Sequence, residues 1–191
     1  MAGTMTPQID PLLKELFADK LYVSTFVEYG RNCVRLKETG KNARLREVTI
    51  MDLPDDSIVL NIDKFKQPKT LFKGKNGECK RCDYILALAK ENRRFLLFIE
   101  MKSGRLNNVE IQQQFKGSEC VIDYCDAVLE RFHGQDDVFK SYEKRFVIFY
   151  KPNLAKRTTQ PFRKPAKNVS PEKALKYPSP QNPSINILLG I

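Results

Sequence analysis

Two runs of apolar residues, at positions 82–89 and 95–102, dominate the middle of the chain. Neither run alternates with polar residues, which is typical of strands buried on both faces. The short polar segment 91–93 separates them, so the pattern predicts a β-hairpin. A further strand is predicted at 57–65, because this segment is rich in β-branched residues and follows the turn residues 53–56.

A long amphipathic helix is predicted after the hairpin. Asn107, followed three residues later by Glu110, resembles a capping box with asparagine in the capping role. Apolar residues then recur at spacings of three and four, which predicts a helix of about 24 residues whose apolar side faces a sheet. Gly117 lies inside this predicted helix although glycine has a low helix propensity. The apolar segment 145–150 predicts another buried strand.

The N-terminal part of the chain is less clear. Asp10-Pro11 resembles a helix cap with proline at the first helical position, and the apolar residues that follow predict a helix to about Leu21. The segment 22–51 is ambiguous and compatible with short strands. The resulting order of helix, three strands, helix and strand predicts an α/β domain over residues 1–151, with a mixed central sheet flanked by helices.

The composition changes after this domain. Residues 151–183 contain seven of the eleven prolines and eight Lys or Arg residues against one acid, Glu172, and so carry +7 of the formal charge of +10. This predicts an extended basic arm over residues 152–191, with a solvated linker as the alternative. The apolar segment 185–189 predicts an edge strand at the end of the arm.

The overall composition limits the classes of function. A hydrophobic fraction of 41% is that of a folded protein, and 33 Lys and Arg against 23 acids favour a polyanionic partner such as nucleic acid over a merely soluble basic protein. Charged residues interrupt the first twenty positions, so no secretion signal is expected, and no run approaches the roughly 18 apolar residues of a membrane span. Five cysteines, an odd number, indicate reduced thiols. We therefore expect a cytoplasmic protein without a membrane partner.

The hairpin brings two acids and a lysine together. In an antiparallel hairpin, the residue numbers of two paired residues add up to a constant. With a turn of two or four residues this constant is 183 or 185, so that Asp83 lies opposite Glu100 or Lys102. Glu100 and Lys102 share a face because side chains alternate along a strand. An odd turn would put Asp83 on the other face. An exposed strand end with a solvated salt bridge is the alternative, against which the continuous apolar run 95–99 argues.

Such a cluster favours a bound cation. Two neighbouring carboxylates at the ends of apolar strands repel each other and lose hydration, so a positive charge should compensate them. Carboxylate and water oxygens are the ligands that suit Mg²⁺ or Mn²⁺. Lys102 could then orient a water molecule or help to deprotonate it.

The arrangement Asp83…Glu100-Met101-Lys102, with sixteen residues between the acids, resembles the PD-(D/E)xK nuclease superfamily, as does the order of elements over 57–151. This superfamily includes restriction endonucleases, Holliday-junction resolvases, RecB-type exonucleases and antiphage nucleases. The resemblance implies a restriction-endonuclease-like core that hydrolyses phosphodiester bonds of DNA or RNA, in restriction, repair or antiphage defence. It implies Asp83, Glu100 and the main-chain carbonyl of Met101 as metal ligands, and Lys102 as the residue that acts on the attacking water.

The chain departs from the family pattern in three places. Cys82 stands where the signature has proline. The first helix of the family often supplies another acid, and the sequence does not choose between Glu15 and Glu28. The Gln-x-x-x-Tyr motif of RecB-like members is absent, but Gln114 occupies a comparable place, four residues before Ser118 on the inward face, and is expected to support the catalytic residues.

Other reactive residues have ordinary explanations. Cys79-x-x-Cys82 is half of a zinc site, but Cys120 and Cys125 are poorly spaced to complete it, so unligated thiols are favoured. His133 is the only histidine, and its place at a helix end suits the helix dipole better than catalysis.

Three functions remain open. An active metal-dependent nuclease is favoured over a catalytically inactive nuclease-fold subunit that binds nucleic acid, and over an unrelated α/β interaction protein with a basic tail. DNA is expected as partner more than RNA, and a homodimer or larger complex is compatible with the sequence. Basic residues of the arm are expected to contact phosphates without reading sequence. They are Lys156, Arg157, Arg163, Lys164 and Lys167.

Overall fold

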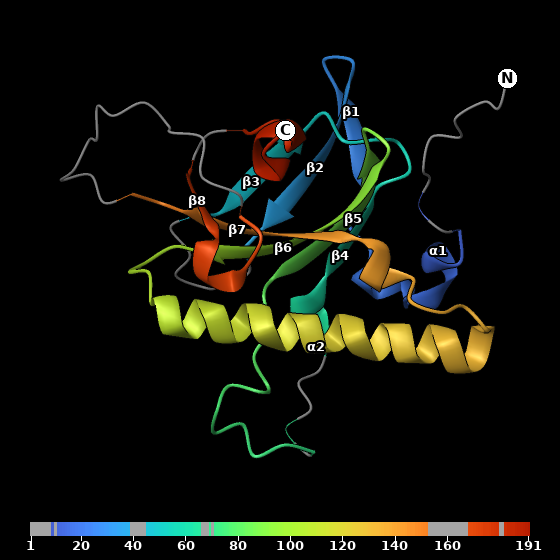
Figure 1. Ribbon diagram of the computed structural model, residues 1–191. Helices are drawn as coiled ribbons and strands as arrows, with labels where there is room; N and C mark the ends of the chain where they lie inside the picture. The colour runs from blue at the N-terminus through green and yellow to red at the C-terminus, as the bar shows by residue number, and fades with distance from the viewer. Residues whose placement is uncertain are drawn as a thin grey trace, which may run out of the picture.

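The computed structural model describes residues 9, 11–38, 45–65, 69, 71–152, 168–179 and 182–191 as a mixed α/β structure with two sheets (Figure 1). Its helices are α1 (Leu13–Leu16), α2 (Asn108–His133) and α3 (Ile185–Leu189). Its strands are β1 (Thr25–Glu28), β2 (Arg31–Lys37), β3 (Glu47–Met51), β4 (Ile58–Asn61), β5 (Tyr84–Lys90), β6 (Arg93–Lys102), β7 (Glu143–Tyr150) and β8 (Leu175–Pro178). Three strands form one sheet in the order β1-β2-β3, and five form the other in the order β4-β5-β6-β7-β8.

The predicted hairpin is the centre of the larger sheet. β5 and β6 pair antiparallel with Tyr84 opposite Ile99, which is the register whose positions sum to 183. The turn has two residues, Glu91 and Asn92, with φ of 51° and 56°. Two residues at positive φ are typical of a type I′ turn, whose twist matches that of the flanking strands. The predicted hairpin is thus confirmed, and its turn has an even length, which is the condition for Asp83 to share a face with Glu100 and Lys102.

The directions of the remaining strands of this sheet depend on the segments that connect them. β4 pairs antiparallel with β5, whereas β7 runs parallel to β6 and is reached through α2, because parallel strands need a long crossover. β8 extends the sheet parallel to β7. β4 ends at Asn61, earlier than the predicted strand 57–65, because the Asn61 side chain caps a 3₁₀ helix at Ile62–Lys64 by accepting a hydrogen bond from the Lys64 N–H.

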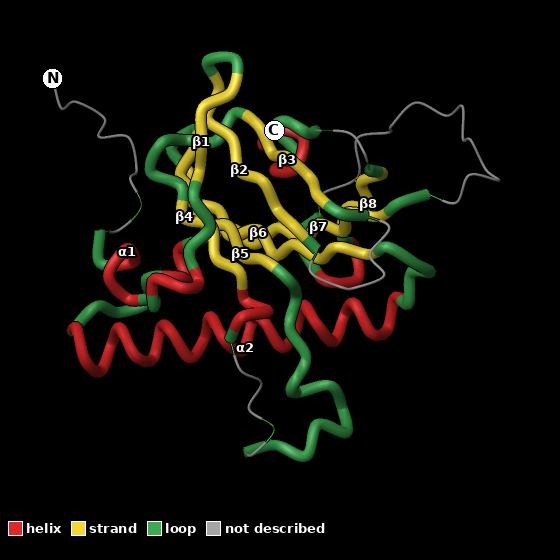
Figure 2. The backbone as a smooth tube through the Cα atoms, turned by 180° about the vertical axis from the view of Figure 1, so that it is seen from behind, coloured by secondary structure: helices red, strands yellow, loops and turns green. Residues whose placement is uncertain are grey.

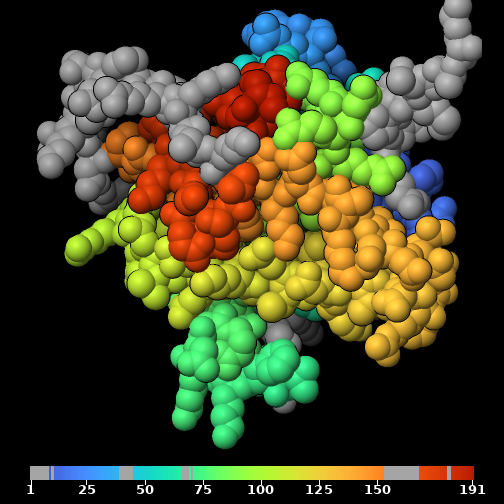
Figure 3. All heavy atoms as spheres, in the orientation of Figure 1, coloured from blue at the N-terminus to red at the C-terminus, as the bar shows by residue number. Residues whose placement is uncertain are grey.

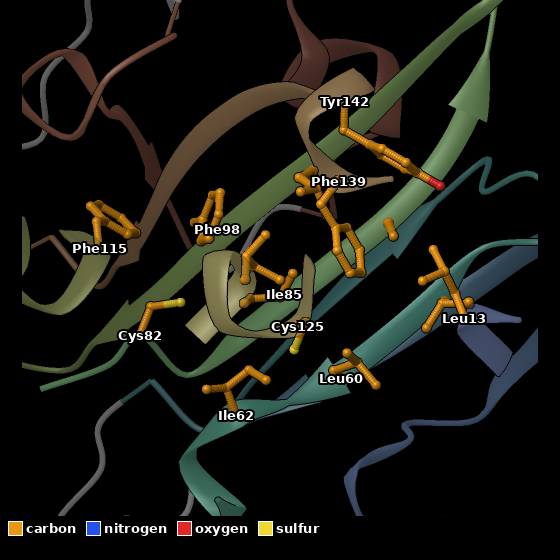
Figure 4. Close-up of a cluster of buried hydrophobic side chains, with 14 of the residues drawn as sticks. Leu13, Leu60, Ile62, Cys82, Ile85, Phe98, Phe115, Cys125, Phe139 and Tyr142 are labelled. Atoms are coloured by element: carbon orange, nitrogen blue, oxygen red, sulfur yellow. The ribbon is translucent and has the colours of Figure 1, made fainter. Parts of the chain in front are cut away.

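The helix α2 covers one face of the larger sheet (Figures 1 and 2). It begins at the predicted cap, where the Asn107 side chain accepts from the Glu110 N–H, and ends before Gly134. Aromatic rings fill the interface: Phe98 stacks on Phe146 with centroids 5.0 Å apart, and Phe115 meets Phe146 edge-on at 5.2 Å. Figure 4 shows this cluster, which also includes side chains from β4 and α1.

The opposite face packs against the smaller sheet and α3. Val34 and Ile50 from the smaller sheet, and Leu188 from α3, are fully buried in a second cluster with Leu97 and Ile99. Because both faces are covered, β6 is continuously apolar from Phe95 to Ile99 instead of alternating.

The N-terminal helix is shorter than predicted. α1 ends at Leu16, and Phe17 is already extended with ψ of 146°. The Tyr22 hydroxyl donates to the carbonyls of Leu13 and Lys14, at 3.1 and 2.8 Å, and so replaces the N–H groups that a longer helix would have supplied. The predicted cap Asp10 lies outside the described residues.

The predicted edge strand at 185–189 is wrong, because this segment forms α3. The Ser184 hydroxyl accepts from the Asn186 N–H at the start of the helix, and Gly190 closes it with φ of 74°. The strand at the edge of the sheet is instead β8, where Pro178 is tolerated because no further strand pairs with it. The five basic residues expected to contact phosphates (156, 157, 163, 164 and 167) lie outside the described residues. Within the described part of the chain, no helix has the length and apolar character to cross a membrane.

Candidate functional site

Asp83, Glu100 and Lys102 lie together at one end of the central hairpin. Asp83 immediately precedes β5, and the register of the hairpin places it opposite Glu100 in β6. Side chains alternate along a strand, so Asp83, Glu100 and Lys102 share the face on which Ile85 and Phe98 pack with α2. The two-residue turn therefore brings the two carboxylates and the ammonium to one face.

The contacts within this cluster are short. The Lys102 ammonium lies 2.6 Å from Glu100 Oε1, and the Gln114 amide donates to the same oxygen at 2.8 Å. The Met101 N–H donates to Asp83 Oδ2 at 2.6 Å. Glu100 is only 1% exposed, whereas the Lys102 side chain is 23% exposed. The other oxygen of Glu100, Oε2, is buried and has no hydrogen-bond partner in the described part of the chain.

The electrostatics of the pair favour an added positive charge. Burial, and then the charge of Asp83, hold the pKa of Glu100 well above its ordinary value. Burial also raises the pKa of Asp83, although the hydrogen bond from Met101 opposes the shift. Desolvation lowers the pKa of Lys102, but the charge of Glu100 and the hydrogen bond to it outweigh this, so its pKa is raised and it stays an ammonium. One lysine does not relieve both carboxylates, so the site suits a further cation.

The donors available for such a cation are all oxygens. Among the described residues, no group of three His, Cys, Asp or Glu side chains could hold a metal ion, so a main-chain ligand is needed. The N–H and the carbonyl of one strand residue point to the same side. The Met101 carbonyl therefore points to the side of Asp83, which its N–H contacts. Two carboxylates, one with a partnerless buried oxygen, and a carbonyl fit a hard divalent cation.

Helix α2 holds the segment that leads to Asp83. At Gly117 an added Cβ would lie 1.9 Å from the Lys80 carbonyl oxygen, so only glycine allows this close approach. The neighbouring Ser118 hydroxyl accepts from the Cys82 N–H at 2.8 Å, and this bond is buried. The glycine that conflicted with a helix by propensity is thus required by the packing of the segment before Asp83.

Gln114 connects the same segment to the carboxylates. Its amide nitrogen donates to the Arg81 carbonyl at 3.3 Å as well as to Glu100 Oε1. It therefore orients Glu100 and leaves Oε2 without a protein donor. Gln114 was predicted to lie beside the two acids, and the structure places it there.

The additional acids near the site differ from those considered in the sequence. Glu15 lies in α1 and Glu28 ends β1, whereas the acids whose charges raise the pKa of Asp83 are Asp63 and Glu38. Asp63 follows β4 in the 3₁₀ helix, and its N–H donates to the Asp83 carbonyl at 3.4 Å. The pairing of β4 with β5 was the signal that could have identified Asp63.

Two of the cysteines lie near the site, since Cys79 lines the cavity and Cys82 directly precedes Asp83. All five cysteines are free. Cys79 and Cys82 are buried, and burial raises the pKa of the Cys82 thiol, which keeps it protonated. His133 is exposed at the C-terminal end of α2.

A cavity of about 480 Å³ borders the site, and Asp83 and Gln114 belong to its lining. Comparison of the chain with models of protein families, with curated proteins and with solved structures found no match. The function of the site therefore has to follow from its own geometry and chemistry.

Proposed function

We propose that this protein is a metal-dependent nuclease with a restriction-endonuclease-like core. The observation that carries the proposal is the buried Oε2 of Glu100, which has no hydrogen-bond partner among the described residues and lies in a cluster with Asp83 and Lys102. The larger sheet supports it, because its strands β4, β5 and β6 are followed by the crossover helix α2 and the parallel strand β7, although β1–β3 come between α1 and β4. A buried carboxylate oxygen without a partner costs free energy, so its presence indicates that a ligand supplies the missing partner.

Asp83, Glu100 and the Met101 carbonyl would hold a Mg²⁺ or Mn²⁺ ion. When bound, the ion supplies positive charge that stabilises the charge developing on phosphate oxygens, and it lowers the pKa of water. The carboxylates are suited to this role because their shared burial makes double ionisation unfavourable without a cation.

The reaction is hydrolysis of a phosphodiester. The oxygen of water forms a bond to phosphorus, the bond from phosphorus to one sugar oxygen breaks, and the proton lost by the water is balanced by one gained at the leaving oxygen. Lys102 remains an ammonium 2.6 Å from Glu100 and is partly exposed, so it can place the water and stabilise negative charge on the phosphate. Gln114 acts as a positioning residue, because it contacts Glu100 and the Arg81 carbonyl.

The charge of the chain supports a polyanionic substrate. The formal net charge is +10, and much of it lies in the arm, where Lys156, Arg157 and Arg163 belong to the segment outside the described residues. Such residues add affinity for phosphates without reading sequence. We propose DNA as the more suitable substrate, with RNA as the alternative.

The test is a cleavage panel with the purified full chain. Labelled single-stranded and double-stranded DNA and RNA are incubated with Mg²⁺, with Mn²⁺ and with EDTA. The proposal predicts cleavage of at least one substrate with a divalent ion and none with EDTA. Salt-sensitive binding without cleavage under any condition would contradict it, and would select a nuclease-fold subunit that binds nucleic acid without cutting it.

A further inference from the structure

The cavity beside Asp83 has a second wall that the proposed chemistry does not use. The cavity is lined by Asp83 and Gln114, and also by a wall of Lys69, Phe72 and Lys73 from the loop between the 3₁₀ helix and β5. Figure 3 shows this loop projecting from the body of the protein below α2. The cavity therefore extends from Asp83 to an outlying part of the surface.

Phe72 gives this wall an exposed aromatic ring. It is 47% exposed although phenylalanine is usually buried. A flat aromatic face beside a polar site is the surface on which an unpaired nucleic-acid base stacks. A base inside a duplex offers no such face, because its neighbours already stack on it.

The lysines of the wall suit phosphate groups. Two of the four basic residues that line the cavity are already held within the protein: Lys80 lies 3.6 Å from Glu110, and the buried Arg81 guanidinium donates to a main-chain carbonyl. Lys69 and Lys73 are exposed, and neither forms an ion pair with another described residue. They are the cations of the cavity that an incoming anion can reach.

The second half of the loop is fixed against α2. The Lys80 ammonium donates to Gln113 Oε1 at 3.1 Å, and the Lys80 carbonyl lies against Gly117. Gly77, with φ of 87°, packs so closely on Gln113 that an added Cβ would lie 2.7 Å from it. The contacts with α2 thus hold the second half of the loop, and the Cys79 thiol, which donates to the Phe72 carbonyl at 3.8 Å, links the wall to it. This link restrains the wall before a ligand binds, which lowers the entropic cost of binding.

We infer that this cavity binds an unpaired nucleotide, so that the substrate is single-stranded nucleic acid or a frayed strand end. The base stacks on Phe72, and the flanking phosphates contact Lys69 and Lys73. This places a phosphodiester next to Asp83. The inference of cleavage rests on the proposed function, but the inference of binding does not.

The test measures binding of the full chain in EDTA by fluorescence anisotropy, so that no cleavage occurs. The probes are a labelled single-stranded oligonucleotide and a hairpin duplex of the same sequence. We expect the single strand to bind at least about tenfold more tightly. Phe72→Ala should weaken single-strand binding by at least about fivefold, which corresponds to the lower end of base stacking on an aromatic side chain. Leu71→Ala is the matched control, because Leu71 is 75% exposed in the same loop and does not line the cavity.

The lysines are tested by the salt dependence of the same binding. Lys73→Gln should reduce the slope of log affinity against log salt by about 0.7, the value for one phosphate of a single strand. The exposed Lys75, which does not line the cavity, provides the control Lys75→Gln, with a smaller change.

Three outcomes separate the two proposals. The cavity inference would be overturned if the duplex bound as tightly as the single strand. It would also be overturned if Phe72→Ala bound the single strand no more weakly than Leu71→Ala does. The nuclease proposal survives that result if Mg²⁺-dependent cleavage is present. Single-strand binding that depends on Phe72, in a protein that cuts no substrate, supports the cavity inference and contradicts the nuclease.

Discussion

The close approach of Lys80 to Gly117 gives a prediction whose sign is opposite to that expected from helix propensity. Replacing a helical glycine by alanine usually stabilises a helix by about 1 kcal/mol. In Gly117→Ala, however, the new Cβ would lie 1.9 Å from the Lys80 carbonyl oxygen, which must move away by about 1 Å or more. We therefore expect the variant to be less stable than the wild type.

The size of the effect follows from what the displaced segment contacts. Overpacking of this kind costs about 1–3 kcal/mol. If the movement also breaks the buried bond from the Cys82 N–H to Ser118, the unsatisfied groups add about 1–3 kcal/mol. After the gain in helix propensity is subtracted, the net loss is about 3 kcal/mol. At a urea dependence of roughly 2 kcal/mol per molar, the unfolding midpoint falls by roughly 1.5 M.

The assay is urea unfolding followed by circular dichroism, with Asp123→Ala as the control. Asp123 is exposed on α2, so this variant gains helix propensity without meeting another segment, and it should be as stable as the wild type or slightly more stable. Gly117→Ala should also slow cleavage by about a hundredfold, because a shift of about 1 Å reaches Asp83. If Gly117→Ala is as stable as Asp123→Ala, Lys80 does not pack on α2 as described.

Three further predictions concern ions and charge. At a Mg²⁺ concentration of about 100 Kd, the free energy of unfolding of the wild type should rise by about 2.7 kcal/mol and its Tm by roughly 5–10 °C. EDTA should reverse this increase, and Glu100→Gln should largely remove it. An equal gain in Glu100→Gln would place the ion elsewhere. The hydrogen bond from Arg93, aided by Arg145, lowers the pKa of Glu143 to about 2. The ionised carboxylate therefore stabilises the fold at pH values above its unfolded pKa, and this stabilisation is lost as the pH falls from about 4.5 towards 2. Because Glu143 is 41% exposed, Glu143→Gln should cost less than about 1 kcal/mol at pH 7, measured by urea unfolding, and a difference that persists at pH 2 would contradict this assignment. Replacing Lys156, Arg157, Arg163, Lys164 and Lys167 by Glu should weaken nucleic-acid binding and make its salt dependence shallower, and an unchanged slope would leave the arm a linker.

The parts of the fold that could be predicted are those specified by local patterns. The two apolar runs and the two-residue turn at Glu91 and Asn92 determine the register of the hairpin, and the register places Asp83 with Glu100 and Lys102. The start of α2 was predicted because the Asn107 cap is local. These features need no information about distant segments.

The rest depends on contacts between segments that are far apart in sequence. The strands β1, β2 and β3 have short, irregular patterns, and their pairing is decided by packing on the larger sheet. The segment 185–189 is an apolar run too short to distinguish a strand from a helix, although Ser184 and Gly190 were cap signals that could have decided it.

The same limit applies to the site. Asp63 and Glu38 come near Asp83 only through the turn after β4 and through the end of β2. The requirement for glycine at 117 exists only because the Lys80 main chain passes α2 at that point. Neither relation has a signature in the local sequence.

The central claim is that Asp83, Glu100 and Lys102 form a metal-dependent nuclease centre. The most direct measurement compares single-turnover cleavage in Mg²⁺ by the wild type, Glu100→Gln and the control Glu119→Gln, which alters an acid of α2 that pairs with Lys144 instead. Circular dichroism and urea unfolding verify that each variant is folded. We predict that Glu100→Gln lowers the cleavage rate by at least about a hundredfold and that Glu119→Gln leaves it within about threefold of the wild type. Wild-type cleavage by a folded Glu100→Gln variant, or cleavage that persists in EDTA, would contradict the account.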